Sequence, residues 1–180
     1  TRTAGRSRLD TVAPVDVVSE KALTRTGTTE LAQSLSTLAP SINFPRPAIT
    51  DGTDHIRPAT LRGLAPDQTL VLVNGARRHS SALVNVNGSI GRGSAAVDLN
   101  AIPTIALDRV EVLRDGAAAI YGSDAIAGVI NFILKEDTDG ATITTEVGQY
   151  YEGDGFLFTS SANFGMGLGE NGFVNVSVEY

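Results

Sequence analysis

Residues 141–180 contain segments in which apolar and polar side chains alternate. These segments are 141–151, 156–166 and 173–180, joined by glycine-rich turns. In the last one, Val174, Val176 and Val178 alternate with polar residues, which is typical of a strand with one apolar and one polar face. Strands of a membrane barrel show this pattern and need only about 9–11 residues each. The sequence therefore predicts neighbouring antiparallel strands of a barrel wall.

The two ends of the chain have the features expected of part of a longer polypeptide. Three strands cannot close a barrel and would leave an adhesive open edge, so we expect further strands after Tyr180. Residues 1–13 are polar and basic and have no apolar export segment, so we expect a flexible lead-in from which any signal has been removed. The longest apolar run, Ala125–Leu134, is shorter than the roughly 18 residues of a membrane helix.

Residues 14–140 carry the signals of an α/β (α+β) domain with a small mixed sheet and short helices. Strands are predicted at 15–18, 69–73, 109–113 and 127–134. The segment 127–134 is nearly continuous apolar sequence, which is typical of a strand covered on both faces. Asn74-Gly75 predicts a two-residue hairpin turn, because both residues tolerate positive φ.

The predicted helices of this domain are short. The clearest spans 31–38, where leucines recur on one face, and Thr28 or Thr29 is expected to cap it. The proline- and glycine-containing stretch 41–58 is predicted to be an exposed loop. The sequence thus divides into a lead-in at 1–13, an α/β domain at 14–140 and the first barrel strands at 141–180.

Composition argues against nucleic-acid binding and against several kinds of catalytic site. Lys and Arg number 14 against 20 Asp and Glu, so the net charge is −6 and no basic surface suits a phosphate backbone. The absence of cysteine excludes disulfides, thiolate metal sites and cysteine nucleophiles. His79-Ser80 lacks a Gly-x-Ser-x-Gly elbow, and Asp51 with Asp54 lacks the other ligands of a calcium loop. We therefore expect no catalytic residue, metal or cofactor.

Sequence blocks between residues 10 and 136 point to a known family. They are Pro14-Val15-Asp16-Val17-Val18, Leu31–Asn43, Leu61-Arg62-Gly63-Leu64 with Val71–Gly75, and Ile105–Gly116 followed by Ala119–Asn131. In this order, and followed by barrel-like strands, the blocks resemble the plug domain of TonB-dependent outer-membrane transporters. This chain has Asn74-Gly75 where the family usually has Asp-Gly, and Asp115-Gly116 where it usually has Gly-Pro.

The resemblance implies a plug inside the 22-stranded barrel of a Gram-negative outer membrane, a lumen size that calls for plugging. The implied function is gating of energy-coupled uptake of a scarce or bulky nutrient, such as a siderophore, cobalamin or an oligosaccharide. The implied partners are TonB with its inner-membrane energising complex, the barrel of the same polypeptide, outer-membrane lipid and the nutrient. TonB would add to an N-terminal box expected before Thr1. The alternative is a soluble periplasmic interaction module with a β-rich tail.

The resemblance also implies a lock between plug and barrel. Arg62 and Arg114 stand where family plugs carry arginines that pair with barrel glutamates. Arginine suits this role because its planar guanidinium makes two parallel bonds to a carboxylate. Glu111 is a candidate third member of the network. The plainer interpretation is that these side chains are solvated at the ends of strands.

Two polar loops, 44–56 and 79–96, are the candidate substrate-facing apices. The candidate contact residues are Arg46, Asp54, His55, His79, Asn85, Asn87 and Arg92. They offer hydrogen-bond donors and acceptors on exposed, glycine-containing loops. For any single one, the plainer interpretation is a solvated loop residue.

Overall fold

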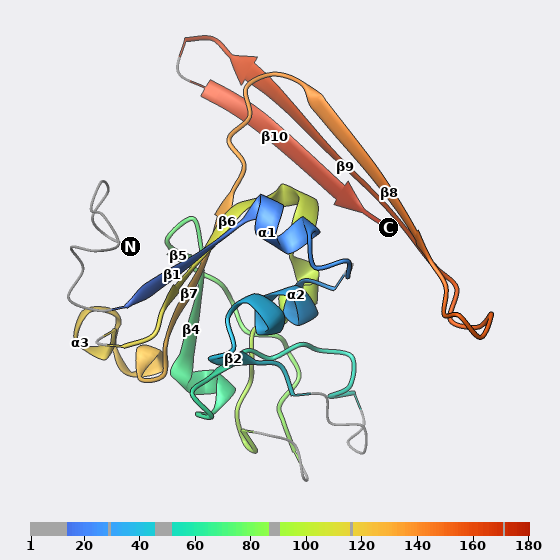
Figure 1. The fold of residues 1–180 in the computed structure, drawn as a ribbon. Coiled ribbons are helices and arrows are strands. Elements are labelled where there is room, and N and C mark those ends of the chain that lie inside the picture. The colour runs from blue at the N-terminus through green and yellow to red at the C-terminus, as the bar shows by residue number, and fades with distance from the viewer. Residues whose placement is uncertain (1–13, 29, 46–51, 87–90, 116, 171) are drawn as a thin grey trace.

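The structure is a computed structural model that describes residues 14–28, 30–45, 52–86, 91–115, 117–170 and 172–180. It consists of an α/β domain and a separate three-stranded sheet that arches over one side of that domain (Figure 1). Among the described residues, no helix has the length and apolar character needed to cross a membrane.

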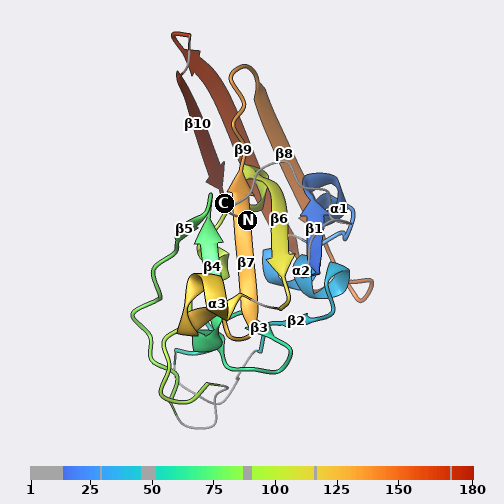
Figure 2. The same cartoon turned by 90° about the vertical axis from the view of Figure 1, so that its left-hand side faces the viewer.

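The α/β domain is built on a mixed sheet with the strand order β1-β6-β7-β4-β5 (Figure 2). Its strands are β1 (Val15–Ser19), β4 (Thr69–Val73), β5 (Ala76–Arg77), β6 (Leu107–Leu113) and β7 (Gly128–Leu134). Only β4 and β7 run parallel, and the other pairs are antiparallel. β7 occupies the centre and is buried over most of its length, as its continuous apolar sequence predicted.

Short helices cover both faces of this sheet (Figure 1). They are α1 (Glu20–Thr24), α2 (Leu31–Leu38) and α3 (Ala118–Tyr121), with 3₁₀ turns η2 (Pro66–Gln68), η3 (Leu99–Ala101), η4 (Thr104–Ala106) and η5 (Ser123–Ala125). The larger core lies on the α1–α2 side, where Leu35 and Phe132 are fully buried. A smaller core around Leu72 and Ala125 lies on the α3 side.

The helix predicted at 31–38 is confirmed, but its cap is different from the predicted one. Glu30, not Thr28, is the N-cap residue, and it makes no side-chain cap hydrogen bond. The Thr28 hydroxyl instead accepts a hydrogen bond from the Glu30 backbone N–H (3.3 Å). Thr29 lies outside the described residues.

The hairpin predicted at Asn74-Gly75 is confirmed. Both residues have positive φ, 49° and 78°, and Val73 pairs with Ala76 across the turn. The turn is also fastened to the central strand, because the Gly75 backbone N–H donates to the Asn131 side-chain oxygen (3.0 Å).

The stretch 41–58 is less exposed than predicted. β2 (Ile42–Asn43) pairs with β3 (Thr60–Leu61), and Ile42 belongs to the larger core. Thr53 and Ile56 are also buried, so part of this stretch packs against the domain and does not form a solvated loop.

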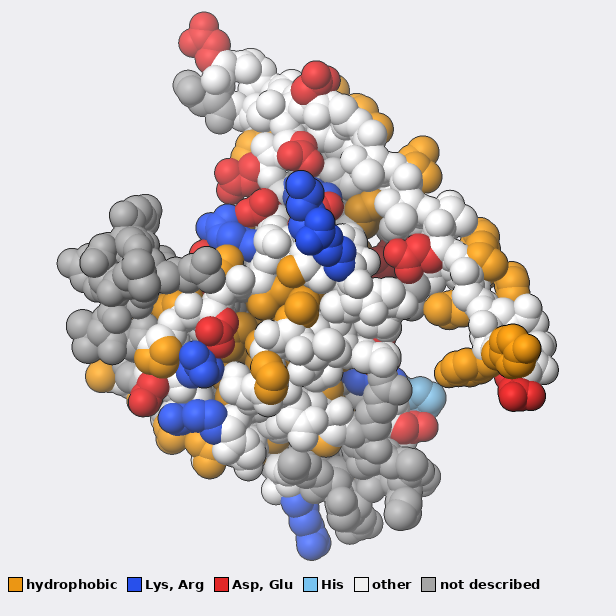
Figure 3. Space-filling view, in the orientation of Figure 1, with side chains coloured by type: hydrophobic (Ala, Val, Ile, Leu, Met, Phe, Trp, Pro, Cys, Tyr) orange, Lys and Arg blue, Asp and Glu red, His pale blue; other side chains and the backbone are white. Residues whose placement is uncertain are grey.

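The three strands predicted after residue 140 form one antiparallel sheet, with β8 (Ala141–Gly148), β9 (Leu157–Leu168) and β10 (Gly172–Glu179) in the order β10-β9-β8. The register aligns apolar with apolar side chains, as in Val176 opposite Phe164. These two side chains are exposed on the face turned away from the α/β domain, and apolar side chains line the outer edge of this sheet in Figure 3. On the inner face, Asn163 is buried and donates to Asn175 (2.5 Å) and Ser177 (2.7 Å).

Candidate functional site

Arg114 lies just past the end of β6 and is bonded to the start of β1. Its Nε lies 3.0 Å from Asp16 Oδ2, and its Nη2 donates to Asp16 Oδ1 (3.3 Å). Its backbone N–H donates to the Pro14 carbonyl (3.2 Å). Both charged side chains are partly exposed, at 40% each. Arg114 is therefore paired with a carboxylate of its own domain.

Arg62 lies directly after β3, in an unusual backbone conformation. Its φ is +54°, in the left-handed region that non-glycine residues seldom adopt. The side chain donates to the Ile126 carbonyl (3.2 Å) and lies 3.7 Å from Asp115 Oδ1. Because Asp115 follows Arg114, the two predicted lock arginines are brought to neighbouring positions at the end of β6.

Glu111 belongs to a different cluster, in the middle of the sheet. It accepts hydrogen bonds from Arg109 Nε (3.0 Å) and Asn131 Nδ2 (3.4 Å). Burial acts to raise the pKa of Glu111, but hydrogen bonds and positive charges, those of Arg109 among them, outweigh burial and lower it. The pKa of Arg109 is raised in turn, first by its hydrogen bond to Asp108 and then by Glu111. Glu111 thus contacts Arg109 and Asn131 within the sheet, and its membership of the lock stays a prediction.

The candidate loops are held by an arginine that the sequence analysis did not single out. Arg57 Nε donates to Glu30 (2.5 Å), and Arg57 Nη1 donates to the Asp54 carbonyl (2.7 Å). Its backbone N–H donates to Asp98, the N-cap of η3 (3.0 Å). Arg57 therefore joins the 52–58 segment to α2 and η3. Its partners are 27 and 41 residues distant, so no local pattern signals this role.

The described residues of the second loop pair with one another, and the loop touches the first. Val84 and Ala95 form an isolated antiparallel bridge, and the Ser81 backbone N–H donates to the Ala96 carbonyl (2.7 Å). Gly52 lies against the side chain of Leu83. Both loops extend from the same end of the domain, at the bottom of Figure 1.

The candidate contact residues of these loops differ in their exposure to solvent. Asp54, His55, His79 and Arg92 are exposed. Asn85 is not exposed as predicted, because its side chain is 1% accessible and its backbone pairs with Ser94 inside the hairpin. Arg46 and Asn87 lie outside the described residues. The exposed members occupy both loops.

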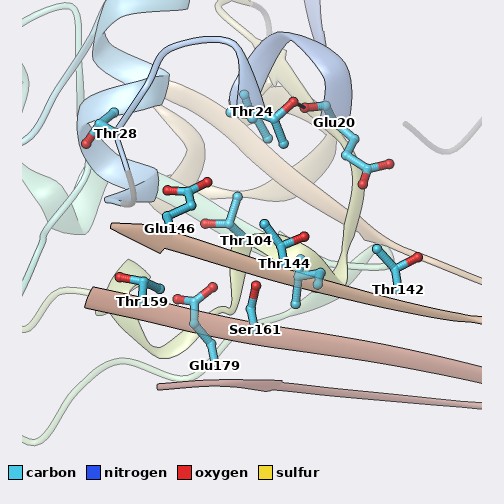
Figure 4. A pocket seen from close by; sticks show the side chains of 12 residues that line it. Glu20, Thr24, Thr28, Thr104, Thr142, Thr144, Glu146, Thr159, Ser161 and Glu179 are labelled. Carbon is cyan, nitrogen blue, oxygen red and sulfur yellow. Dashed lines mark hydrogen bonds between the residues drawn. The ribbon is translucent and has the colours of Figure 1, made fainter. Parts of the chain in front are cut away.

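A gap separates the α/β domain from the three-stranded sheet, and Leu23 and Ile105 of the domain contribute apolar surface to it (Figure 4). Carboxyl and hydroxyl side chains face it from both sides: Glu20, Thr24, Thr28, Thr104, Thr142, Thr144, Glu146, Thr159, Ser161 and Glu179. Glu20 accepts a hydrogen bond from Lys135 Nζ (2.7 Å). A polar interface of this kind resembles a transient contact and permits relative movement.

The described side chains include no group of three or more His, Cys, Asp or Glu residues suited to hold a metal ion. The arrangement offers ionic contacts at the end of β6, exposed polar loops at one end of the domain, and a gap lined by hydroxyl and carboxyl groups between the domain and the three-stranded sheet. These features suit reversible contacts between surfaces.

Comparison with known proteins gives a family match over most of the chain. Residues 7–129 match the family model described as the TonB-dependent Receptor Plug Domain. The vitamin B12 transporter BtuB of Vibrio cholerae serotype O1 is 31% identical over 172 residues, covering 93% of this chain and 24% of the relative. The ferric enterobactin receptor PirA of Pseudomonas aeruginosa is 33% identical over 123 residues, covering 68% of this chain and 16% of the relative.

Solved structures agree with these matches. The ferric enterobactin receptor PfeA of Pseudomonas aeruginosa superposes with a TM-score of 0.67 at 25% identity, covering 94% of this chain and 24% of the receptor. The siderophore receptor PirA of Acinetobacter baumannii gives 0.66 at 24% identity, covering 92% and 24%. The chain therefore spans about a quarter of the length of the first relatives it matches.

Proposed function

This chain belongs to the TonB-dependent receptor plug domain family, and we propose that the protein containing it is an outer-membrane receptor whose plug gates energy-coupled nutrient uptake. In this proposal, residues 14–140 are the plug, residues 141–180 are the first strands of the barrel, and residues 1–13 lead in from the N-terminal side. The relatives are transporters and receptors. The uptake proposed here does not require that any covalent bond be made or broken.

The observation that carries this proposal is the two-faced sheet of β8–β10. Its apolar face, with Ile143, Phe164 and Val176, points away from the plug, while its polar face meets the plug across the gap. Lipid outside and a hydrated lumen inside are the surroundings that satisfy both faces. A soluble periplasmic module is not favoured, because it would leave this apolar face in water.

The lock of the proposed receptor consists of Arg62 and Arg114 with carboxylates of the barrel wall. Both side chains are partly exposed and therefore accessible to a second carboxylate beside Asp115 and Asp16. Glu111 is excluded from this lock in the proposal, since Arg109 and Asn131 bind it at the centre of the sheet.

The substrate proposed for this receptor is a scarce or bulky nutrient of the cobalamin or siderophore kind. The support comes from relatives named for vitamin B12 and ferric enterobactin. Substrate would meet the exposed polar side chains of the loops, Asp54, His55, His79 and Arg92, at the end that the Arg57 contacts hold in place. Asn85, Arg46 and Asn87 are not assigned contacts in this proposal.

TonB is the proposed energising partner, and it would pull on a segment N-terminal to β1. Substrate binding at the loops would shift the plug, and the pull would displace it along the polar gap. The hydroxyl and carboxylate lining of that gap lowers the cost of the movement, because water replaces the contacts that are broken.

Uptake in cells tests this proposal. We expect deletion of the gene to reduce accumulation of radiolabelled cobalamin or of a ferric siderophore, and an uncoupler of the proton-motive force to reduce it equally in the parent strain. The proposal would be contradicted if deletion left the accumulation of every tested nutrient unchanged. It would also be contradicted if the uncoupler had no effect on that accumulation in the parent strain.

A further inference from the structure

Each predicted lock arginine already has a carboxylate partner inside the plug. Asp16 of β1 pairs with Arg114, and Asp115 lies 3.7 Å from Arg62. Asp115 occupies one of the two positions at which this chain departs from the family pattern, which usually has glycine there. The two pairs are connected through the backbone, because residues 114 and 115 are consecutive.

The Asp16–Arg114 pair lies where the sheet is most easily opened. Among the strands that the structure describes, β1 lies at the edge of the sheet and pairs with β6 alone, with Val15 opposite Leu113. Beyond this first pair, the Arg114 side chain contacts Asp16 of β1, and its backbone N–H donates to the carbonyl of Pro14, the residue just before β1. A pull arriving from the N-terminal side therefore reaches Asp16 and Arg114 before the remainder of the ladder.

The second pair extends this connection toward the centre of the sheet. Arg62 is held by Asp115 and by the carbonyl of Ile126, which lies just before β7. A continuous series of contacts thus runs from β1 through Arg114 and Asp115 to Arg62. Movement of β1 would therefore act on Arg114 directly and on Arg62 through the covalent link between Arg114 and Asp115.

We propose that Asp16 is a positioning residue of the lock, which holds Arg114 while β1 is in the sheet and withdraws from it when β1 leaves. The first strand of the plug and the lock then respond to the same pull. One hydrogen bond from Arg114 Nη2 and the close approach of its Nε to the carboxylate suit this role, because both contacts are lost when Asp16 moves away with β1. This inference rests on the proposed receptor function.

The test uses the full-length receptor with a reporter cysteine in β1. This chain contains no cysteine, so Val18→Cys introduces a buried thiol that reacts with maleimide only when β1 detaches. We expect Asp16→Asn to raise the labelling rate about three- to tenfold and to lower energised uptake by a similar factor. Asp16→Glu keeps the negative charge, so its labelling rate and its energised uptake should both be close to those of the parent.

The mutant cycle with Arg114 separates positioning from a merely structural effect. If Asp16 acts through Arg114, Asp16→Asn will change neither labelling nor uptake further in an Arg114→Gln background. Asp124→Asn is the matched control, because it removes another partly exposed Asp–Arg pair of the plug, that with Arg77. It should leave the labelling of residue 18 at the parent rate.

Two results would overturn the inference: labelling of Asp16→Asn equal to that of the Asp124→Asn control, or additive effects of the Asp16 and Arg114 substitutions. Failure of the proposed function has a different signature. In that case the parent protein shows no energised uptake, while the labelling cycle still reports whether the two residues are coupled.

Discussion

Replacing Val176 by arginine is expected to destabilise the membrane-inserted protein by about 2–4 kcal/mol, since a guanidinium at mid-strand would face hydrocarbon. Val176 lies in the middle of β10, is 55% exposed and stands opposite Phe164 on the outer face. The free energy of unfolding from detergent or lipid, measured by urea titration of the full-length protein, should fall by this amount. The level of folded protein in the outer membrane should fall with it.

The neighbouring residue provides the control for this substitution. Ser177 lies on the polar inner face, where it accepts a hydrogen bond from Asn163, which also donates to Asn175. We expect Ser177→Arg to change the unfolding free energy by less than about 1 kcal/mol, because a lumen-facing charge stays in water. Equal effects of the two substitutions would show that the sheet does not separate lipid from lumen.

Replacing Gly128 by alanine is expected to destabilise the plug by about 2–5 kcal/mol, through backbone strain and overlap together. Gly128 begins the central strand with φ +142°, a conformation that L side chains rarely adopt. A Cβ atom there would overlap the Leu113 carbonyl oxygen of β6 and press on the side chain of Leu61. The loss of stability arises where β7, the central strand of the sheet, pairs with β6.

Limited trypsin digestion of the full-length protein measures this effect, since an opened plug exposes its arginines. Gly148→Ala is the control, because Gly148 has an ordinary φ and the nearest atom to an added Cβ is Leu157 Cβ at 3.8 Å. We expect rapid cleavage of Gly128→Ala and the parent rate for Gly148→Ala. Parent-like resistance of Gly128→Ala would mean that β6 and β7 can separate without loss of the fold.

The parts of this fold that the sequence predicts well are those governed by local periodicity and turn chemistry. Alternation alone located β8–β10 and assigned Val176 to the outer face, because side-chain direction in a strand has a period of two. Asn74-Gly75 determined the β4–β5 hairpin for an equally local reason.

The features that were missed depend on contacts between distant residues. Asn85 lies in a loop rich in polar and glycine residues, yet it is buried, because residues 81–86 pair with residues 91–96. Arg57 holds the loops through Glu30 and Asp98, and Arg114 meets Asp16 98 residues away. Tertiary packing makes such pairs, and single-sequence patterns carry no signal for them.

Cell fractionation tests the central claim most directly, namely that this chain is the plug and first strands of an outer-membrane barrel. An antibody raised against residues 14–136 should detect a band in the outer membrane several times heavier than 18.8 kDa. Its apparent mass should change on boiling, as that of a folded barrel does. A soluble periplasmic band near 18.8 kDa that is indifferent to boiling would contradict the account.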